Sequence, residues 1–182
     1  MTKLCRYLVI LLLTGSCFAC GTERWAVKVL KDPGAQQINF TAEPTALHAL
    51  LELKAPPNLR TVKPDVRFPA EKQTYTVVAL LIGFKREADG DYHLVLADPV
   101  DRKKTMIAEI PSSECVPAKY RPQFTAAGKV IESISHATPA FKKLPKPVQV
   151  KVTGVLFFDF IHGQTGVAKN GVELHPVLSI SR

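Results

Sequence analysis

The sequence predicts an all-β fold with one helix, and three observations lead to this fold class. Apolar residues follow the spacing of β-strands in five segments. One segment with helical spacing lies between the third and the fourth of them. Turn residues separate the first three segments. The order β-β-β-α-β-β is that of a five-stranded OB-fold-like barrel. A plain β-sandwich is the alternative, because strand order alone does not fix closure.

The first three predicted strands form a meander of residues 74–84, 92–97 and 105–110. Both faces of the first strand are apolar at its centre, as in a long, bent barrel strand. An acidic turn at residues 87–91 follows it, a second turn covers residues 98–103, and Pro111 ends the third strand.

The helix and two further strands complete the predicted barrel. Residues 119–134 space their apolar side chains at helical intervals, although Gly128 weakens the helix. A proline-rich loop follows. Residues 148–157 then form a largely apolar strand, and residues 172–180 form the closing one.

An N-terminal arm precedes the barrel. Residues 23–29 alternate, which predicts a short strand with Trp25 packed inward. Residues 36–40 predict another extended piece, and residues 45–51 a turn or two of helix. Four prolines within residues 55–69 predict an extended connector. Because the arm is too short to own a core, we expect it to pack against the barrel.

The first 19 residues have the layout of a secretory signal peptide. Lys3 and Arg6 precede an apolar run at residues 7–13 and then small residues. The run is shorter than the ~20 apolar residues that cross a bilayer. We therefore expect export to the periplasm or the extracellular space. The expected division is a signal peptide at 1–19, an arm and connector at 20–70, and the barrel at 71–182.

The cysteines predict a disulfide between Cys20 and Cys115. Cleavage after Ala19 would remove Cys5 and Cys17 and leave one isolated pair, which usually bridges in an oxidising compartment. A lipid anchor on Cys20 is the alternative, although the residues before it fit the lipoprotein pattern poorly.

Composition excludes no broad class of soluble protein, with 46% apolar and 22% charged residues. Loss of the signal peptide leaves 22 Lys plus Arg against 16 Asp plus Glu, a net charge of +6. The excess is spread along the chain, with basic runs at residues 102–104 and 142–146, and such runs are typical of solvated loops. A nucleic-acid partner would require them to gather on one face.

The densest polar chemistry lies in the C-terminal hairpin. Its loop, residues 162–171, holds three glycines, and the pair Asn170-Gly171 favours a turn with positive φ at both central residues. One interpretation is structural, with Gln164 and Asn170 capping the loop backbone. The other is a ligand or metal site, for which the candidates are Asp89, Asp91, His93, His162, Gln164, Asn170, Glu173 and His175. Zinc requires three protein ligands and an open position, but this spacing is not a recognised zinc signature.

Three stretches and the hairpin resemble a family of uncharacterised, exported bacterial proteins. The stretches read CGTERW (20–25), DYHLVL (91–96) and TMIAEIP (105–111), and the hairpin reads HGQTG at 162–166 and NGVELHP at 170–176. The resemblance spans most of the mature chain. It implies one recurring design and no activity.

A second resemblance is to thermonuclease-type OB-fold enzymes, through Asp89-Gly90-Asp91 at the start of the second strand. It implies a divalent cation held by carboxylates, here Asp89 or Asp91 with Asp98, and arginines that neutralise a phosphate. The third strand lacks the arginine and the aspartates that this pattern requires. Asp-Gly-Asp is also a good hairpin turn.

Two hypotheses of function follow. The first is a secreted, non-catalytic OB-fold-like binding module that takes an oligosaccharide or a nucleic acid between the loops at 87–91 and 162–171. The alternative is a metal-dependent extracellular hydrolase. Both predict that the two loops converge at one end of the barrel, which would bring Asp89 and Asp91 toward His162 and Asn170. A divalent metal is the only cofactor implied, with these ligands for the hydrolase: Asp89, Asp91, His162, Glu173 and His175.

Overall fold

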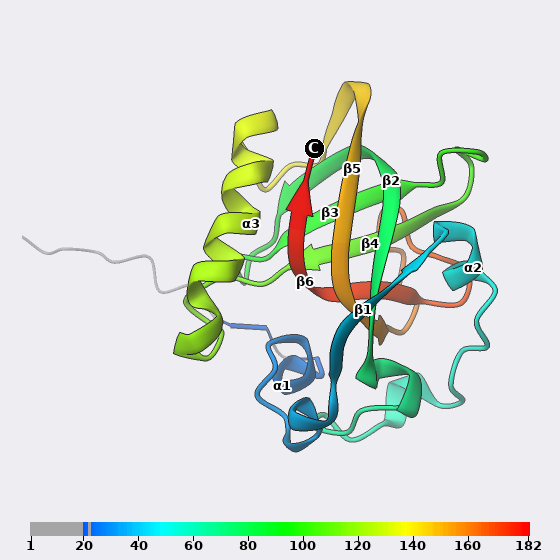
Figure 1. Ribbon diagram of the computed structural model, residues 1–182, viewed down its shortest axis with the longest axis vertical. Helices are drawn as coiled ribbons and strands as arrows, with labels where there is room; N and C mark the ends of the chain where they lie inside the picture. The colour runs from blue at the N-terminus through cyan, green and yellow to red at the C-terminus, as the bar shows by residue number, and fades with distance from the viewer. Residues whose placement is uncertain (1–19, 22) are drawn as a thin grey trace, which may run out of the picture.

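The computed structural model describes residues 20–21 and 23–182, and β-strands dominate it. One mixed sheet holds six strands in the order β1-β2-β3-β4-β6-β5, and β2 also pairs with β5 (Figure 1). Five strands therefore close into a hydrogen-bonded ring, with β1 added alongside β2. The strands are β1 (Asn39–Thr45), β2 (Gln73–Arg86), β3 (Tyr92–Ala97), β4 (Thr105–Ile110), β5 (Lys142–Phe158) and β6 (Val172–Ser181).

The pairings of the ring bring polar residues of different strands together. The neighbours are antiparallel except for β4 and β6, which run parallel, as does the added pair β1–β2. Register places His93 on β3 opposite Glu109 on β4. It also places Ile107 on β4 opposite Glu173 on β6. The carboxylates of neighbouring strands thus approach one end of the ring.

The prediction of an all-β fold with a helix is confirmed at a coarse level, since the described chain is mostly β-sheet with few helices. The bounds of β3 and β4 are those that the sequence predicts. Strand β2 extends further than expected, because it pairs with β3 and β5 at once across an irregularity between Leu81 and Gly83. Val77, Ala79 and Leu81 are buried while Val78 is 47% exposed, so only one of the two apolar faces of β2 is fully buried.

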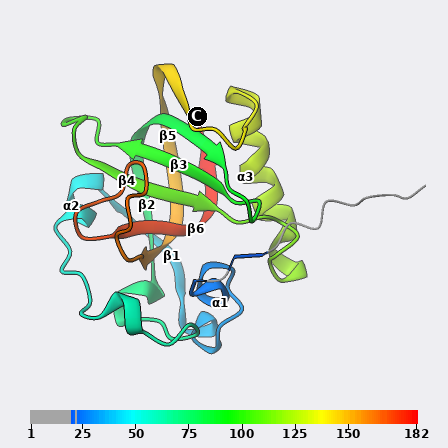
Figure 2. The same cartoon turned by 180° about the vertical axis from the view of Figure 1, so that it is seen from behind.

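Helix α3 (Arg121–Ile134) covers one side of the ring next to β6 (Figures 1 and 2). It buries the face that the helical spacing predicts, including Phe124 and Ile131. Gly128 lies on this face, and a Cβ there would lie 3.0 Å from the ring of Tyr92. Gly128, which weakens the helix, therefore allows α3 to lie close to Tyr92 on β3.

The short strand predicted for residues 23–29 is wrong. Trp25–Lys28 forms a single helical turn, α1, after Arg24 adopts a left-handed conformation with a φ of 47°. The Arg24 side chain binds Glu71, which turns the chain at this point. Trp25 is half-buried rather than packed inward. The extended piece predicted from residue 36 begins instead at Asn39, because Pro33–Gln37 forms a 3₁₀ helix.

The remaining N-terminal arm packs on the ring. Helix α2 (Leu47–Leu51) forms where expected, and two short 3₁₀ helices, Leu59–Thr61 and Pro69–Lys72, interrupt the proline-rich connector. Val29 and Leu50, among other apolar residues of the arm, belong to the same buried core as the ring strands.

The disulfide between Cys20 and Cys115 is confirmed, with their Cα atoms 5.7 Å apart. It joins the start of the arm to the segment between β4 and α3. The signal peptide predicted at 1–19 lies outside the described residues. Within the described part of the chain, the helices are all too short or too polar to cross a membrane.

Candidate functional site

One cleft, of about 400 Å³, collects polar side chains from six segments of the chain. Its walls are residues 20–21 and 23–28, the acidic turn between β2 and β3, strands β3, β4 and β6, and the loop after β5. Lys28 is the one lysine or arginine among the described residues that line it. Seven carboxylates line the same cleft: Glu23, Glu87, Asp89, Asp91, Glu109, Asp159 and Glu173.

The structure brings most of the predicted site residues to this cleft. His175 is fully buried and does not line the cleft, but its Nε2 atom lies 3.6 Å from Asp91 Oδ2. The acidic turn and the hairpin loop both line the cleft, so they meet at one end of the ring. The predicted residues that line the cleft are Asp89, Asp91, His93, His162, Gln164 and Glu173.

Asn170 and Asp98 lie elsewhere. The Asn170 side-chain amide donates to the backbone carbonyls of Leu50 and Leu53, both at 3.0 Å, and so fastens the loop to α2. Asp98 accepts hydrogen bonds from the backbone of its own turn and contacts His48 on α2. Both residues have structural roles, and Asp98 supplies no carboxylate to the cleft.

Gln164 and the glycines shape the loop. Gln164 Oε1 accepts a hydrogen bond from the His162 backbone, and its amide donates to the Phe160 carbonyl. Gly166 and Gly171 have φ values of 84° and 70°. The expected turn with two positive φ values is wrong, since Gly171 alone of the Asn170-Gly171 pair has one. Gln164 therefore both lines the cleft and caps the backbone.

His93 is held between two acceptors. Its Nε2 atom lies 2.9 Å from the Thr165 carbonyl oxygen, and its Nδ1 atom lies 2.8 Å from Glu109 Oε1. A carbonyl and a carboxylate only accept, so the ring donates from both nitrogens and carries a positive charge. Burial opposes this charge, but the hydrogen bond and the charge of Glu109 outweigh it and raise the pKa of His93 above 6.5.

Glu109 also faces His175. Its Oε2 atom lies 3.1 Å from His175 Nδ1, but the pair lacks hydrogen-bond geometry and is a purely electrostatic contact. Burial opposes ionisation of Glu109, yet its contacts with His175 and His93 hold its pKa well below 4.5. Despite its own burial, His175 has a raised pKa because Asp91 and Glu109 face it.

Glu173 and Lys28 complete the floor of the cleft. Burial, followed by the charges of Glu109 and Asp159, raises the pKa of Glu173 above 4.5. Lys28 Nζ lies 3.4 Å from Asp159 Oδ2 and 5.3 Å from the centre of the Phe157 ring. Burial lowers the pKa of Lys28, but Asp159, Glu109 and Glu173 outweigh burial and raise it. Lys28 is therefore a permanent cation that balances only part of the acidic charge.

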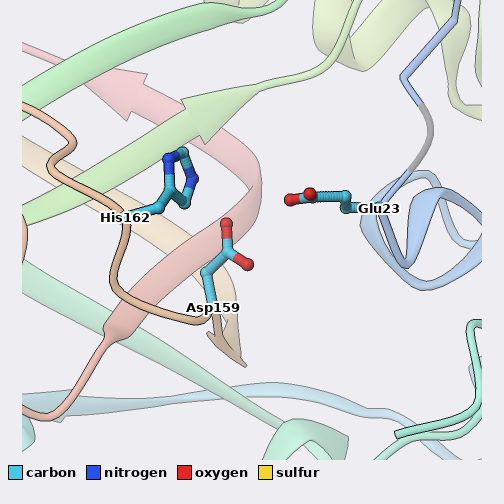
Figure 3. Close-up of side chains that lie close together, drawn as sticks. All are labelled: Glu23, Asp159 and His162. Carbon is cyan, nitrogen blue, oxygen red and sulfur yellow. The ribbon is translucent and has the colours of Figure 1, made fainter. Parts of the chain in front are cut away.

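Three metal-ligating side chains converge at the rim of the cleft, from three separate segments (Figure 3). Glu23 comes from the segment before α1, Asp159 follows β5, and His162 belongs to the loop. One ligand atom from each lies within 4.8 Å of the others. Glu23 and His162 are exposed while Asp159 is buried, so solvent reaches this rim triad. The His162 ring also packs against Phe160, at 4.9 Å between ring centres.

Five charged residues of the cleft escaped prediction as site residues: Glu23, Lys28, Glu87, Glu109 and Asp159. The first two lie in the segment predicted as a strand. Glu109 lies in a strand that otherwise reads as apolar. A usable signal did exist, since the predicted strands 92–97 and 105–110 with their short turn place Glu109 across from His93, the pairing that the structure has.

The fold and the site define a β-rich, disulfide-linked protein with one acidic, histidine-containing cleft. No family model, curated protein or solved structure matches this chain. A proposal of function therefore rests on the cleft.

Proposed function

We propose that this protein is an exported, non-catalytic module with an OB-like fold, and that its cleft binds a divalent metal cation. The ring order supports an OB-like fold, since a helix lies between its third and fourth strands. The turn at 87–91 and the loop at 162–171 then correspond to the loops between which OB barrels bind ligands. The disulfide supports an oxidising compartment outside the cytoplasm.

One observation carries the proposal: seven carboxylates line a single cleft of a chain whose net charge is +8. The positive charges beside these carboxylates are Lys28 and the two histidines His93 and His175, which are three charges against seven. At the rim, Glu23, Asp159 and His162 offer two oxygens and one nitrogen. Three protein ligands beside solvent are what a metal site with an open position requires.

Two features of the cleft argue against the ligands of other OB modules: its negative charge against a nucleic acid, and the covering of Trp25 against a sugar. A phosphate backbone binds where lysines and arginines gather, and this cleft would repel it. Trp25 lines the cleft and offers an aromatic surface for a sugar. Lys31 Nζ, however, lies 4.6 Å from the centre of the Trp25 ring and covers one face. A cation is therefore favoured over a nucleic acid or an oligosaccharide.

The metal-dependent hydrolase is the second candidate, because a metal with an open position also activates water. Hydrolysis of a phosphodiester requires positive charge where the transition state becomes negative. Among the described residues, no arginine lines the cleft, and Lys28 is paired with Asp159. The site therefore favours binding over this reaction.

Titration calorimetry tests the proposal on the mature, disulfide-linked protein after removal of metals with a chelator. We expect binding of a divalent cation such as Zn²⁺ or Mn²⁺. Glu23→Gln and His162→Ala should each weaken the rim site at least about tenfold. His136→Ala is the matched control, since this exposed histidine lies outside the cleft and pairs only with Glu132. Absence of any cation binding would contradict the proposal, and turnover of a phosphodiester by the metal-loaded protein would favour the hydrolase.

A further inference from the structure

Apart from the rim triad, one imidazole nitrogen faces two carboxylate oxygens at the floor of the cleft. They are His175 Nδ1, Glu173 Oε2 and Glu109 Oε2, the Glu109 oxygen that His93 does not use. His175 Nδ1 lies 3.1 Å from Glu109 Oε2 and 3.9 Å from Glu173 Oε2. His175 is 0% exposed and Glu173 2% exposed, and neither His175 Nδ1 nor Glu173 Oε2 has a hydrogen-bond partner among the described residues. Because unpaired buried polar atoms cost free energy, this arrangement points to a bound ligand.

We propose that these three atoms bind a second divalent metal ion of the Zn²⁺ class at the floor of the cleft. This floor site extends the proposed function to another ion and rests on the same acidic cleft, but it uses none of the rim ligands. Two ligands that each lie about 2.1 Å from one tetrahedral zinc are about 3.4 Å apart. The separations of His175 Nδ1 from the two carboxylate oxygens, 3.1 and 3.9 Å, bracket this value.

The surrounding residues orient the floor ligands, as the hydrogen-bond partners of ligating side chains do in metal sites. His93 donates to Glu109 Oε1 at 2.8 Å and is itself fixed by the Thr165 carbonyl, so it positions the Glu109 carboxylate. Asp91 Oδ2 lies 3.6 Å from His175 Nε2, and the negative charge there favours a proton on that nitrogen. The Nδ1 lone pair of His175 is then directed toward Glu109 and Glu173.

Access and ligand chemistry define the kind of ion. Glu109 and Glu173 both line the cleft, so an ion that they bind has an open position on that side. One imidazole nitrogen with two carboxylate oxygens suits Zn²⁺ and similar transition metals, whereas Ca²⁺ and Mg²⁺ prefer oxygen ligands alone. In the metal-free protein, protons replace the ion, which agrees with the raised pKa values of Glu173 and His175.

Zinc stoichiometry and X-ray absorption of the full mature chain test the floor site. Native mass spectrometry should find two Zn²⁺ in the wild type, and absorption spectra should give about one imidazole per zinc. His162→Ala should keep one zinc with one imidazole. Glu173→Gln, which conserves the side-chain volume, should keep the rim zinc and weaken the floor site at least about tenfold. Glu109→Gln should act in the same way, and circular dichroism of the metal-free variants checks that they fold.

The outcomes separate the two proposals. Two ions with unchanged affinity in both Glu173→Gln and Glu109→Gln would overturn the floor site. A single wild-type zinc that disappears in His162→Ala would overturn it as well and leave the proposed function standing. A wild type without any bound cation would overturn both. If neither glutamine variant folds, the wild-type spectrum decides, because two zinc ions with only half an imidazole per zinc contradict a histidine at the floor.

Discussion

Arg24 and Glu71 form a buried, two-pronged ion pair, with Nη1 2.7 Å from Oε1 and Nη2 2.6 Å from Oε2. Both partners also clamp the end of β5. Arg24 donates to the Phe158 carbonyl at 3.0 Å, and Glu71 accepts from the Phe158 backbone N–H at 3.0 Å. Glu23 directly precedes Arg24 in the sequence, and Asp159 directly follows Phe158. The pair therefore fixes the separation of two rim ligands.

Removal of one partner of this ion pair should strongly destabilise the fold. Arg24→Met leaves the Glu71 carboxylate buried without a counter-charge, which typically costs about 3–5 kcal/mol. Urea unfolding of the metal-free protein measures the change. His136→Ala removes an exposed pair with Glu132 and should change stability by less than about 0.5 kcal/mol. A loss under about 1 kcal/mol in Arg24→Met would show that water reaches the pair.

Gly171 should tolerate a side chain less well than Gly163, although both have positive φ values, of 70° and 93°. A Cβ at Gly171 would collide with the Asp159 backbone oxygen, whereas a Cβ at Gly163 meets nothing within 4 Å. Alanine at either position costs on the order of 1 kcal/mol for backbone strain. Gly171→Ala should therefore lower the melting temperature well beyond Gly163→Ala. Equal melting temperatures would mean that the loop moves away from Asp159 at little cost.

The disulfide should support both stability and the rim site. Cys20 and Cys115 are 95 residues apart, and a bridge that closes a loop of this length contributes about 4–5 kcal/mol in the loop-entropy model. A double Cys→Ser variant also releases the segment that carries Glu23. Its cation affinity at the rim should fall, while the floor site should keep its affinity. Mass spectrometry of the exported protein checks the bridge first, and a lipid on Cys20 would contradict it.

The strands were predictable because alternation is a local property of a sequence. In β3 and β4, short turns and a terminal proline mark the ends, and both bounds are correct. Helix α1 was not predictable in this way. Its start depends on the contact between Arg24 and Glu71, which are 47 residues apart, and the apolar pattern of residues 23–29 fits a strand equally well.

The candidate site was predictable to the extent that it followed from strand pairing and loop position. Asp89, Asp91 and His162 share the cleft because the β2–β3 turn and the loop after β5 meet at one end of the ring. Asn170 lies outside the cleft, because its side-chain amide donates hydrogen bonds to two backbone carbonyls of the α2 region. Glu109 was overlooked because a single carboxylate in an apolar strand indicates a site only when its contacts in the folded chain are known.

Stability of the metal-free protein should depend on pH in two opposite ways. His93 and His175 have pKa values raised above 6.5, so their contribution is complete below pH 6.5 and is lost as pH rises through the higher folded values. The raised pKa of Glu173 has the same effect, because its contribution to stability is complete below pH 4.5 and is lost as pH rises through the folded value. Glu109 has a lowered pKa, so its contribution is present above pH 4.5 and is lost as pH falls through the folded value.

We therefore expect metal-free stability to be greatest in the lower part of the window from about pH 4.5 to 6.5, because Glu173 already lowers it above pH 4.5, and to decline on both sides, as urea unfolding across pH would measure. Glu109→Gln removes the carboxylate that both histidines face, so its profile should be flatter on each side. Saturating Zn²⁺ should oppose the decline above pH 6.5, because metal binding requires deprotonated ligands and strengthens as protons leave. A wild-type profile that rises from pH 6.5 to 8.5 without metal would contradict the charged state assigned to His93 and His175.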